Sequence, residues 1–247
     1  MKLVFAAITS VVSALVIASV VSFAPAADAA TGSGKIATET RTVSDFEAIA
    51  LAGSMDITVR QGTKEGLQIQ ADDNLLPLIE TVVESGSGGR TLAIRFKRGE
   101  NINHHAPIKI TVDVIRLTAV AASGSGDVIV EALKTPSFKL ALSGSSDAKL
   151  RSLNTDALEV RISGSGDIAA AGSARQVKLS IAGSGDADLA GLTADDVSVR
   201  IAGSGDASVT ANKSLEVSVA GSGDVRYGGA VGAVKSSIAG SGSVTRR

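Results

Sequence analysis

The chain has 247 residues and a formal net charge of -1, and it contains no cysteine. The absence of cysteine excludes disulfide bonds, thiol catalysis and a lipid-modified N-terminal cysteine. The near-zero net charge gives no electrostatic case for binding to nucleic acid or to an anionic membrane. The length is within the range of a single long domain.

Residues 1–29 predict a signal peptide for export. Lys2 precedes an apolar run of small residues over 3–21, and Ala-x-Ala cleavage sites end at Ala26 and Ala29. An uncleaved membrane anchor is the alternative, because the run approaches the length that spans a bilayer. The proline and small residues that follow the run favour cleavage, and no other segment is apolar enough to span a membrane. After the signal, residues 30–37 are expected to form a short flexible leader.

Residues 38–117 predict the irregular N-terminal part of a single domain over 38–247. Apolar and polar residues alternate in several segments, which is the period of a strand with one buried face. The expected strands are 46–51, 55–60, 67–70, 91–97 and 108–114. Residues 72–80 suggest a short capped helix or a loop, and 85–89 a turn. Because Gly53-Ser54-Met55-Asp56 resembles a degenerate copy of a corner repeated later, the region predicts the start of the same repeat with an insertion.

The regular repeats occupy residues 118–247. Gly-Ser-Gly-Asp or a near copy recurs there at intervals of 18 to 20 residues. The copies begin at Gly124, Gly144, Gly164, Gly183, Gly203, Gly221 and Gly240. A period near 20 that carries turn residues predicts a solenoid, in which each repeat is one coil stacked on the last.

Apolar residues alternate with polar ones on both sides of each corner. Phe138, Leu140 and Leu142 precede one corner, and Val128 and Val130 follow another. The period of 2 and the many glycines argue against a helical solenoid. The repeat therefore predicts an all-β fold, a parallel β-solenoid. Each coil is expected to contain a strand, the corner, a short strand and a looser return.

The polar positions between the apolar ones are expected to point outward. Lys139, Glu159 and Lys178 alternate in charge from coil to coil. In a stacked parallel ladder this alternation avoids like-charge neighbours, so a solvated face is the favoured interpretation. An anionic-ligand surface that uses Arg161, Arg200 and the lysines is the alternative, although these cations are scattered.

These features together resemble the head GIN domain family, described as auto-transporter adhesins of the bacterial envelope. The match runs from Thr42 to Val244, through the opening residues 43–62, the middle residues 71–76 and, most specifically, the Gly-Ser-Gly-Asp corners. The resemblance implies an exported, right-handed β-solenoid (β-helix) with no established enzymatic activity. An auto-transporter also carries a C-terminal translocator. The four residues after the last corner cannot supply one, so self-export across an outer membrane is not expected.

An aspartate closes each of the first six regular corners. These residues are Asp127, Asp147, Asp167, Asp186, Asp206 and Asp224. Carboxylates and turn carbonyls suit calcium, but one carboxylate per coil without a second acid makes a poor ion cage. Turn chemistry is favoured, in which glycine supplies a positive φ and the serine and aspartate side chains bond the local backbone. Because stacked carboxylates repel, each is expected to face the amides of its own corner. No metal site and no cofactor is predicted.

Other candidate chemistry is weak in this sequence. His104 and His105 are adjacent, no acid cluster accompanies them, and they are expected in an exposed loop. Glycoside hydrolysis needs two carboxylates at a defined separation. The candidate pairs are Asp186 with Asp188 and Asp195 with Asp196. Neither pair stands out from ordinary surface acids, and the corner serines have no nearby base. No catalytic residue is therefore predicted.

The few aromatic residues are expected in the core. Phe46, Phe96 and Phe138 stand at apolar strand positions, and Tyr227 falls on a buried column where it would plug the C-terminal end. Since platforms of exposed rings commonly bind glycans, this composition disfavours stacking on sugars.

The sequence favours an exported, non-catalytic protein of the periplasm or the cell surface. Its rigid solenoid would present a flat polar face to a surface, polymer or protein partner whose binding residues are unknown. A polysaccharide-active enzyme is the alternative, on fold analogy alone. Self-association is a third hypothesis, because residues 243–245 leave an open strand edge at the last coil. The tail Arg246-Arg247 would discourage that association by charge.

Overall fold

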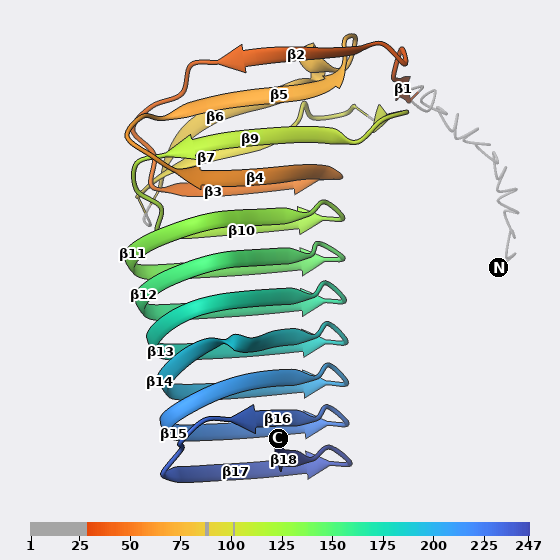
Figure 1. Ribbon diagram of the computed structural model, residues 1–247. Helices are drawn as coiled ribbons and strands as arrows, with labels where there is room; N and C mark the ends of the chain where they lie inside the picture. Colours follow the sequence, from red (N-terminus) through yellow and green to blue (C-terminus); the bar gives the residue numbers. More distant parts are fainter. Residues whose placement is uncertain (1–28, 87–88, 101) are drawn as a thin grey trace, which may run out of the picture.

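The computed structural model describes residues 29–86, 89–100 and 102–247, so residues 1–28 of the signal peptide predicted over 1–29, and the centre of the predicted turn at 87–88, lie outside it. The described chain forms a tall stack of coils (Figure 1). The predicted all-β, parallel β-solenoid is therefore confirmed. Within the described residues, no helix has the length and hydropathy needed to cross a membrane.

The regular coils stack in parallel with matching corners. Gly124 pairs with Gly144 and Gly144 with Gly164, so every coil repeats the register of the one before it. The strands are β10 (Ala119–Gly124), β11 (Val128–Gly144), β12 (Ala148–Gly164), β13 (Ile168–Gly183), β14 (Ala187–Gly203), β15 (Ala207–Gly221), β16 (Val225–Gly228), β17 (Ala233–Gly240) and β18 (Val244–Arg246). The tandem repeat produces this order because each coil contacts mainly its two neighbours.

The return of each coil is more regular than predicted. β11 to β15 are continuous strands of 15 to 17 residues that include the return, which pairs in parallel at Leu133 with Leu153 and Leu153 with Gly172. The variation in repeat length appears as register shifts, as between Leu189 and Thr193. The expectation of a loose return was wrong, because a buried parallel stack satisfies its backbone amides by laddering them.

The core is a set of apolar columns inside the coils. Leu142, Ile162 and Ile181 occupy one column, and each is at most 2% exposed. Phe46 and Phe138 are buried, and Phe96 and Tyr227 are partly buried against the same cluster. The prediction that the aromatic residues belong to the core is confirmed.

The first coil belongs to the same stack. β3 (Ala48–Gly53) and β4 (Met55–Gln61) flank a corner, Gly53 pairs with Gly124, and Ile57 pairs with Val128. The degenerate corner predicted at 53–56 is therefore confirmed as the same structural unit.

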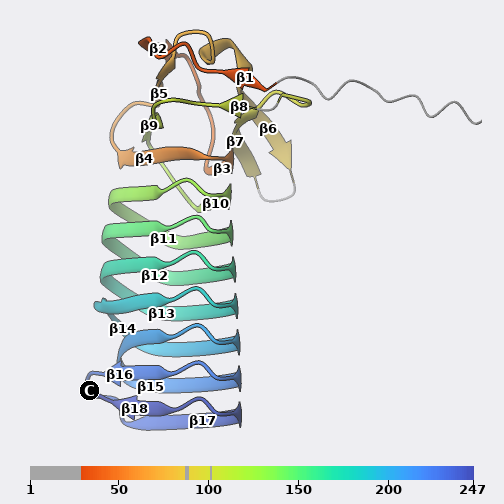
Figure 2. The same ribbon diagram turned by 90° about the vertical axis from the view of Figure 1, so that its right-hand side faces the viewer.

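The insertion caps the top of the stack. It contains β5 (Gly66–Asp72), a 3-10 turn (Leu76–Leu78), β6 (Ile79–Gly86), β7 (Gly89–Phe96), β8 (Ile102–Asn103) and β9 (Ile108–Val114). β2 (Ile36–Arg41), β5 and β9 pair antiparallel, as do β6 and β7. Figure 2 shows the β6–β7 hairpin leaning away from the stack. The antiparallel layer covers the core at this end, as expected of an atypical terminal repeat.

The segment predicted as a flexible leader is bound to this cap. β1 (Ala30–Thr31) pairs with β8, and the Gly34 amide donates to the buried Asp72 carboxylate at 2.8 Å. The Ser33 hydroxyl donates to Asp73 at 2.6 Å. A Cβ on residue 32 would lie 2.1 Å from an Asp72 oxygen, so only glycine fits there. The leader is ordered because Asp72 and Asp73 bind its polar groups.

Candidate binding surface along the aspartate corners

The corners turn tightly because their glycines adopt a backbone that other residues avoid. Gly164 has a φ of +131°, and a Cβ on it would lie 2.2 Å from the carbonyl oxygen of Gly144. The stacked corners therefore touch through their backbones, and the first glycine of each repeat is needed for both its φ and its size. The glycine role predicted for the corner agrees with this geometry.

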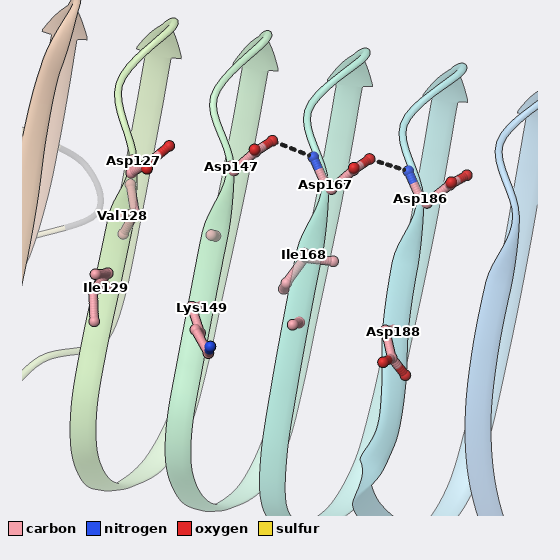
Figure 3. A pocket seen from close by; sticks show the side chains of 11 residues that line it. Asp127, Val128, Ile129, Asp147, Lys149, Asp167, Ile168, Asp186 and Asp188 are labelled. Carbon is pink, nitrogen blue, oxygen red and sulfur yellow. Dashed lines mark hydrogen bonds between the residues drawn. The ribbon is translucent and has the colours of Figure 1, made fainter.

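The aspartate side chains link neighbouring coils. An Oδ1 of each linking residue accepts the backbone N–H of the equivalent residue one coil later, at 2.8 Å. The acceptors are Asp147, Asp167, Asp186, Asp206 and Asp224. Figure 3 shows two of these bonds, from Asp147 to Asp167 and from Asp167 to Asp186. The expectation that each carboxylate faces its own corner was wrong, because the nearest otherwise unpaired amide belongs to the next coil.

Backbone hydrogen bonds in both directions complete the same link. The amide of Ala148 donates to the carbonyl of Asp167 one coil later at 2.8 Å, and the amide of Ser165 donates to the carbonyl of Gly144 one coil earlier at 2.9 Å. Each corner from Asp147 to Asp224 thus joins the next corner through at least two backbone bonds and one carboxylate bond. Because a carboxylate that accepts an amide forms a strong, charge-assisted bond, these aspartates stabilise the stack.

The row of aspartates extends further than the regular repeats. The Asp56 carboxylate accepts the backbone N–H of Asp127 at 3.2 Å. Asp56 lies opposite Lys109 in the register of β4 and β9. The aspartate set predicted from the sequence did not include Asp56. The signal was present, since Asp56 closes the degenerate corner already recognised at 53–56.

The row is altered at the corner that contains Ser146. Gly144 there has a φ of +88°, whereas Gly124 and Gly164 have +127° and +131°. No amide donor reaches the Asp127 carboxylate within the described residues, although equivalent carboxylates elsewhere have one. Burial raises the pKa of the Asp127 carboxyl, and the nearby charges of Asp56 and Asp147 raise that pKa further. Asp127 is therefore the electrostatically least favourable member of the row.

A shallow groove of about 390 Å³ runs beside this part of the row (Figure 3). Four corner aspartates and Asp188 line it together with apolar or small residues and Lys149. The complete lining is Asp127, Val128, Ile129, Asp147, Ala148, Lys149, Asp167, Ile168, Ala169, Asp186 and Asp188. We call this feature the acidic groove. Its five carboxylates against one cation create a negative potential over a floor of aliphatic side chains.

The remaining predicted candidates lie apart. His104 and His105 are in a loop, as predicted. His105 is exposed, whereas His104 is half-buried, with its Nε2 at 3.1 Å from the Ser54 hydroxyl. Asp195 pairs with Lys213 at 2.8 Å, and Asp196 accepts the Ser214 hydroxyl at 2.6 Å. Both acids lie on the return part of β14, which is strand and not the looser return that the repeat predicted.

The second candidate carboxylate pair lies at the acidic groove. Asp186 accepts the Asp206 amide at 2.8 Å, and Asp188 accepts the Ala190 amide at 3.1 Å. Both carboxylates thus have a local structural partner. Among the described residues, no group of three or more histidine, aspartate or glutamate side chains is arranged to hold a metal ion.

Solved structures with the same architecture are described as adhesins or as a lipid-binding protein. A "putative adhesin" from Bacteroides fragilis NCTC 9343 has a TM-score of 0.80 and 28% identity, with 88% of this chain and 100% of that chain covered. A "putative adhesin" from Parabacteroides merdae ATCC 43184 has a TM-score of 0.69, 27% identity, and 90% and 100% coverage.

A third relative carries a different description. A "putative lipid binding protein" from Parabacteroides distasonis ATCC 8503 has a TM-score of 0.73 and 27% identity, with 88% of this chain and 99% of that chain covered. No curated protein matches the chain.

A family model described as "putative auto-transporter adhesin, head GIN domain" matches residues 45–231. The match includes the first coil, the cap and all of the regular corners up to Asp224. The chain therefore belongs to the head GIN domain family.

Proposed function

We propose that this chain is an exported, non-catalytic binding scaffold of the cell envelope or the extracellular space. Its rigid solenoid presents the acidic groove to a surface, polymer or protein partner. The predicted signal peptide over 1–29 supports export, and the family and its adhesin-named relatives support a binding role.

The acidic groove is the observation that carries the proposal. Its corner aspartates are fixed by the stack, because coil-to-coil bonds hold Asp147, Asp167 and Asp186 at the same position in successive coils. A partner that meets this row finds carboxylates at the spacing of stacked parallel strands, about 4.8 Å. Since these groups are already ordered, binding does not carry the entropy cost of fixing them.

Asp147 and Asp167 favour binding over catalysis. Asp147 and Asp167 each use one oxygen on a backbone amide, and the second oxygen of each carboxylate is available to a partner. A hydrolase needs one carboxylic acid that keeps its proton and one carboxylate, produced by unlike environments. Asp147 and Asp167 instead occupy equivalent positions and make equivalent bonds.

The test is capture of a partner from envelope fractions by the immobilised protein. The groove variant is Asp147→Asn with Asp167→Asn, which removes two charges and keeps both Oδ1 acceptors. The matched control is Asp156→Asn with Glu216→Gln, which removes two exposed acids outside the groove. We expect a saturable partner that the groove variant captures at least tenfold less well and the control captures normally.

The outcomes separate three hypotheses. Equal capture by the groove variant and the control would remove the acidic groove as the binding surface. Loss of capture in a chelator would favour a calcium bridge between the row and its partner. Release of reducing sugar from an envelope polysaccharide would replace the scaffold hypothesis by the enzyme hypothesis.

A further inference from the structure

The C-terminal end of the solenoid is an open coil. β17 pairs with β15 and β18 with β16, and no strand of the described chain pairs with their outer edges. Val234 and Ile238 are 41% and 40% exposed, whereas the equivalent Leu215 and Val219 one coil earlier are 1% exposed. The antiparallel layer that covers the core at the other end has no counterpart here (Figure 1).

The open coil carries polar residues at two positions of the core columns where the preceding coil carries Val217 and Tyr227. Ser236 stands where the preceding coil has Val217, and Arg246 stands where it has Tyr227. Both changes place a polar group where a further coil would bury an apolar one. Burial of an unpaired hydroxyl or guanidinium is unfavourable, so this end is poorly suited to stacking on another solenoid.

The open coil is also basic. Residues 225–247 contain four cationic side chains and no aspartate or glutamate. Arg226 and Lys235 are exposed. Arg246 donates to the Gly229 carbonyl at 3.1 Å. Arg247 folds back along the stack, where its guanidinium donates to the Thr210 hydroxyl at 2.6 Å and to the Ala190 carbonyl at 3.4 Å. The net charge of -1 for the whole chain conceals this segregation.

We propose that the open coil docks onto an anionic lipid surface. Exposed aliphatic side chains on a coil that also carries exposed cations suit the boundary between headgroups and acyl chains, where binding grows with apolar area and with attraction to anionic lipids. Two copies that met through this end would bring Arg226, Lys235 and Arg246 of each copy towards the same residues of the other, and this repulsion between like charges disfavours a second copy. A soluble polyanion would leave Val234 and Ile238 in water, so a lipid surface uses more of what the end exposes.

The orientation that follows places the solenoid upright on the membrane. Val234 and Ile238 would enter the interface, and the stack would rise from it with the antiparallel cap farthest away. The acidic groove runs along the side of the stack and does not use the open coil. The lipid proposal therefore does not depend on the function proposed for the groove.

The test is co-sedimentation with vesicles made of equal parts phosphatidylcholine and phosphatidylglycerol, compared with phosphatidylcholine alone. The protein starts at Ala29, so it contains every strand described above and lacks the apolar run over 3–21. The charge variant is Arg226→Gln with Lys235→Gln. Its control is Lys178→Gln with Arg200→Gln, which removes two exposed cations from inner coils. Ile238→Ser tests the apolar contact, and Val82→Ser, at the equally exposed Val82 on β6, is its control.

We expect binding only to the anionic vesicles. Each basic residue near such a surface changes the partition coefficient about fivefold, so the charge variant should bind about 25-fold more weakly. Ile238→Ser should weaken binding severalfold, and both controls should bind like the unmodified protein. Higher salt should weaken binding, because it screens exposed charges.

Several results would overturn the proposal. These are no binding to anionic vesicles, equal weakening by the charge variant and its control, and tight binding to a soluble polyphosphate that Ile238→Ser does not change. Lipid-free dimers that form with rising concentration and disappear with Ile238→Ser would assign the open coil to a second copy instead. A cooperative thermal transition in every variant verifies that each protein is folded.

Discussion

The aspartates at the corners act as structural acceptors before they act as a surface. Asp147, Asp167 and Asp186 each accept the backbone N–H of the equivalent residue in the next coil, so the side chain pairs an amide that the turning backbone leaves unpaired. Such a row concentrates negative charge on one edge of the stack. The hydrogen bonds offset the resulting repulsion between carboxylates at most coils. At Asp127 that bond is absent within the described residues, and burial together with the charges of Asp56 and Asp147 raises the pKa of its carboxyl.

The role of one such acceptor can be isolated at Asp167. Asp167→Ala removes the acceptor for the Asp186 amide and should lower the free energy of unfolding by about 1 kcal/mol. Asp167→Asn keeps the Oδ1 acceptor and should stay close to the unmodified protein. Asp156→Ala, which loses only an exposed pair with Arg175 at 3.8 Å, is the control and should change little. Chemical denaturation measures all three, and equal losses in the alanine and asparagine variants would contradict an acceptor role.

Asp127 predicts a pH-dependent stability of defined sign. Its pKa is raised in the folded state, so the folded protein holds this proton more tightly than the unfolded chain does. The resulting stabilisation is present below the ordinary aspartate pKa, about 3.9, and is lost as the pH rises through the raised value.

Asp127→Asn should therefore raise the melting temperature at neutral pH, by an amount that corresponds to about 0.5 kcal/mol or less for an exposed site. In acid below about pH 3 the difference should vanish, because the aspartate is then protonated in both states. Melting curves at both pH values check the sign. A stabilisation that is the same at both would mean that charge is not its cause.

At the scale of the element, the corner glycines set how closely the coils approach. Gly203 has a φ of +139°, and a Cβ on it would lie 2.1 Å from the Gly183 carbonyl oxygen. Gly203→Ala must then strain the turn and push two coils apart.

We expect Gly203→Ala to cost about 1–3 kcal/mol or more. Gly62→Ala is the matched control, because a Cβ there would have open space, and it should be nearly neutral. Denaturant titrations of the two variants give the comparison. If the two substitutions were equally mild, the corner would have to relax without loss of its ladder.

At the scale of the whole molecule, the solenoid has a closed and an open end. In a linear stack of repeats, the free energy of unfolding is about the sum of the intrinsic stability of each coil and of its interfaces with its neighbours. An inner coil has two neighbours and the last coil has one. Equivalent residues should therefore contribute unequally.

Ile162 and Ile238 occupy the same column at 1% and 40% exposure. Ile162→Ala should cost about 2–5 kcal/mol, because it leaves a cavity in a packed core. Ile238→Ala should cost less than about 1 kcal/mol, and hydrogen exchange should show the last coil opening before the rest. Equal losses at the two sites would indicate that the last coil is covered in solution.

The sequence by itself determined the coil, its period and its core. The corner copies and the alternation around Leu142 and Ile162 are local patterns, and tandem repetition turns a local pattern into a stack. These columns and the positive φ of the corner glycines could therefore be predicted without coordinates. The same repetition revealed the first corner at 53–56, although it is degenerate.

Three features could be learned only from the folded structure. These are the amide that each aspartate binds, the order of the leader, and the places where charged side chains cluster. These features join residues far apart in the chain, as the 20 positions between Asp147 and Asp167 and the 38 between Gly34 and Asp72 illustrate. A sequence pattern fixes which face a side chain occupies. Whether the nearest unpaired donor lies in the same coil or the next depends on how closely the coils stack, and that distance is a property of the folded molecule.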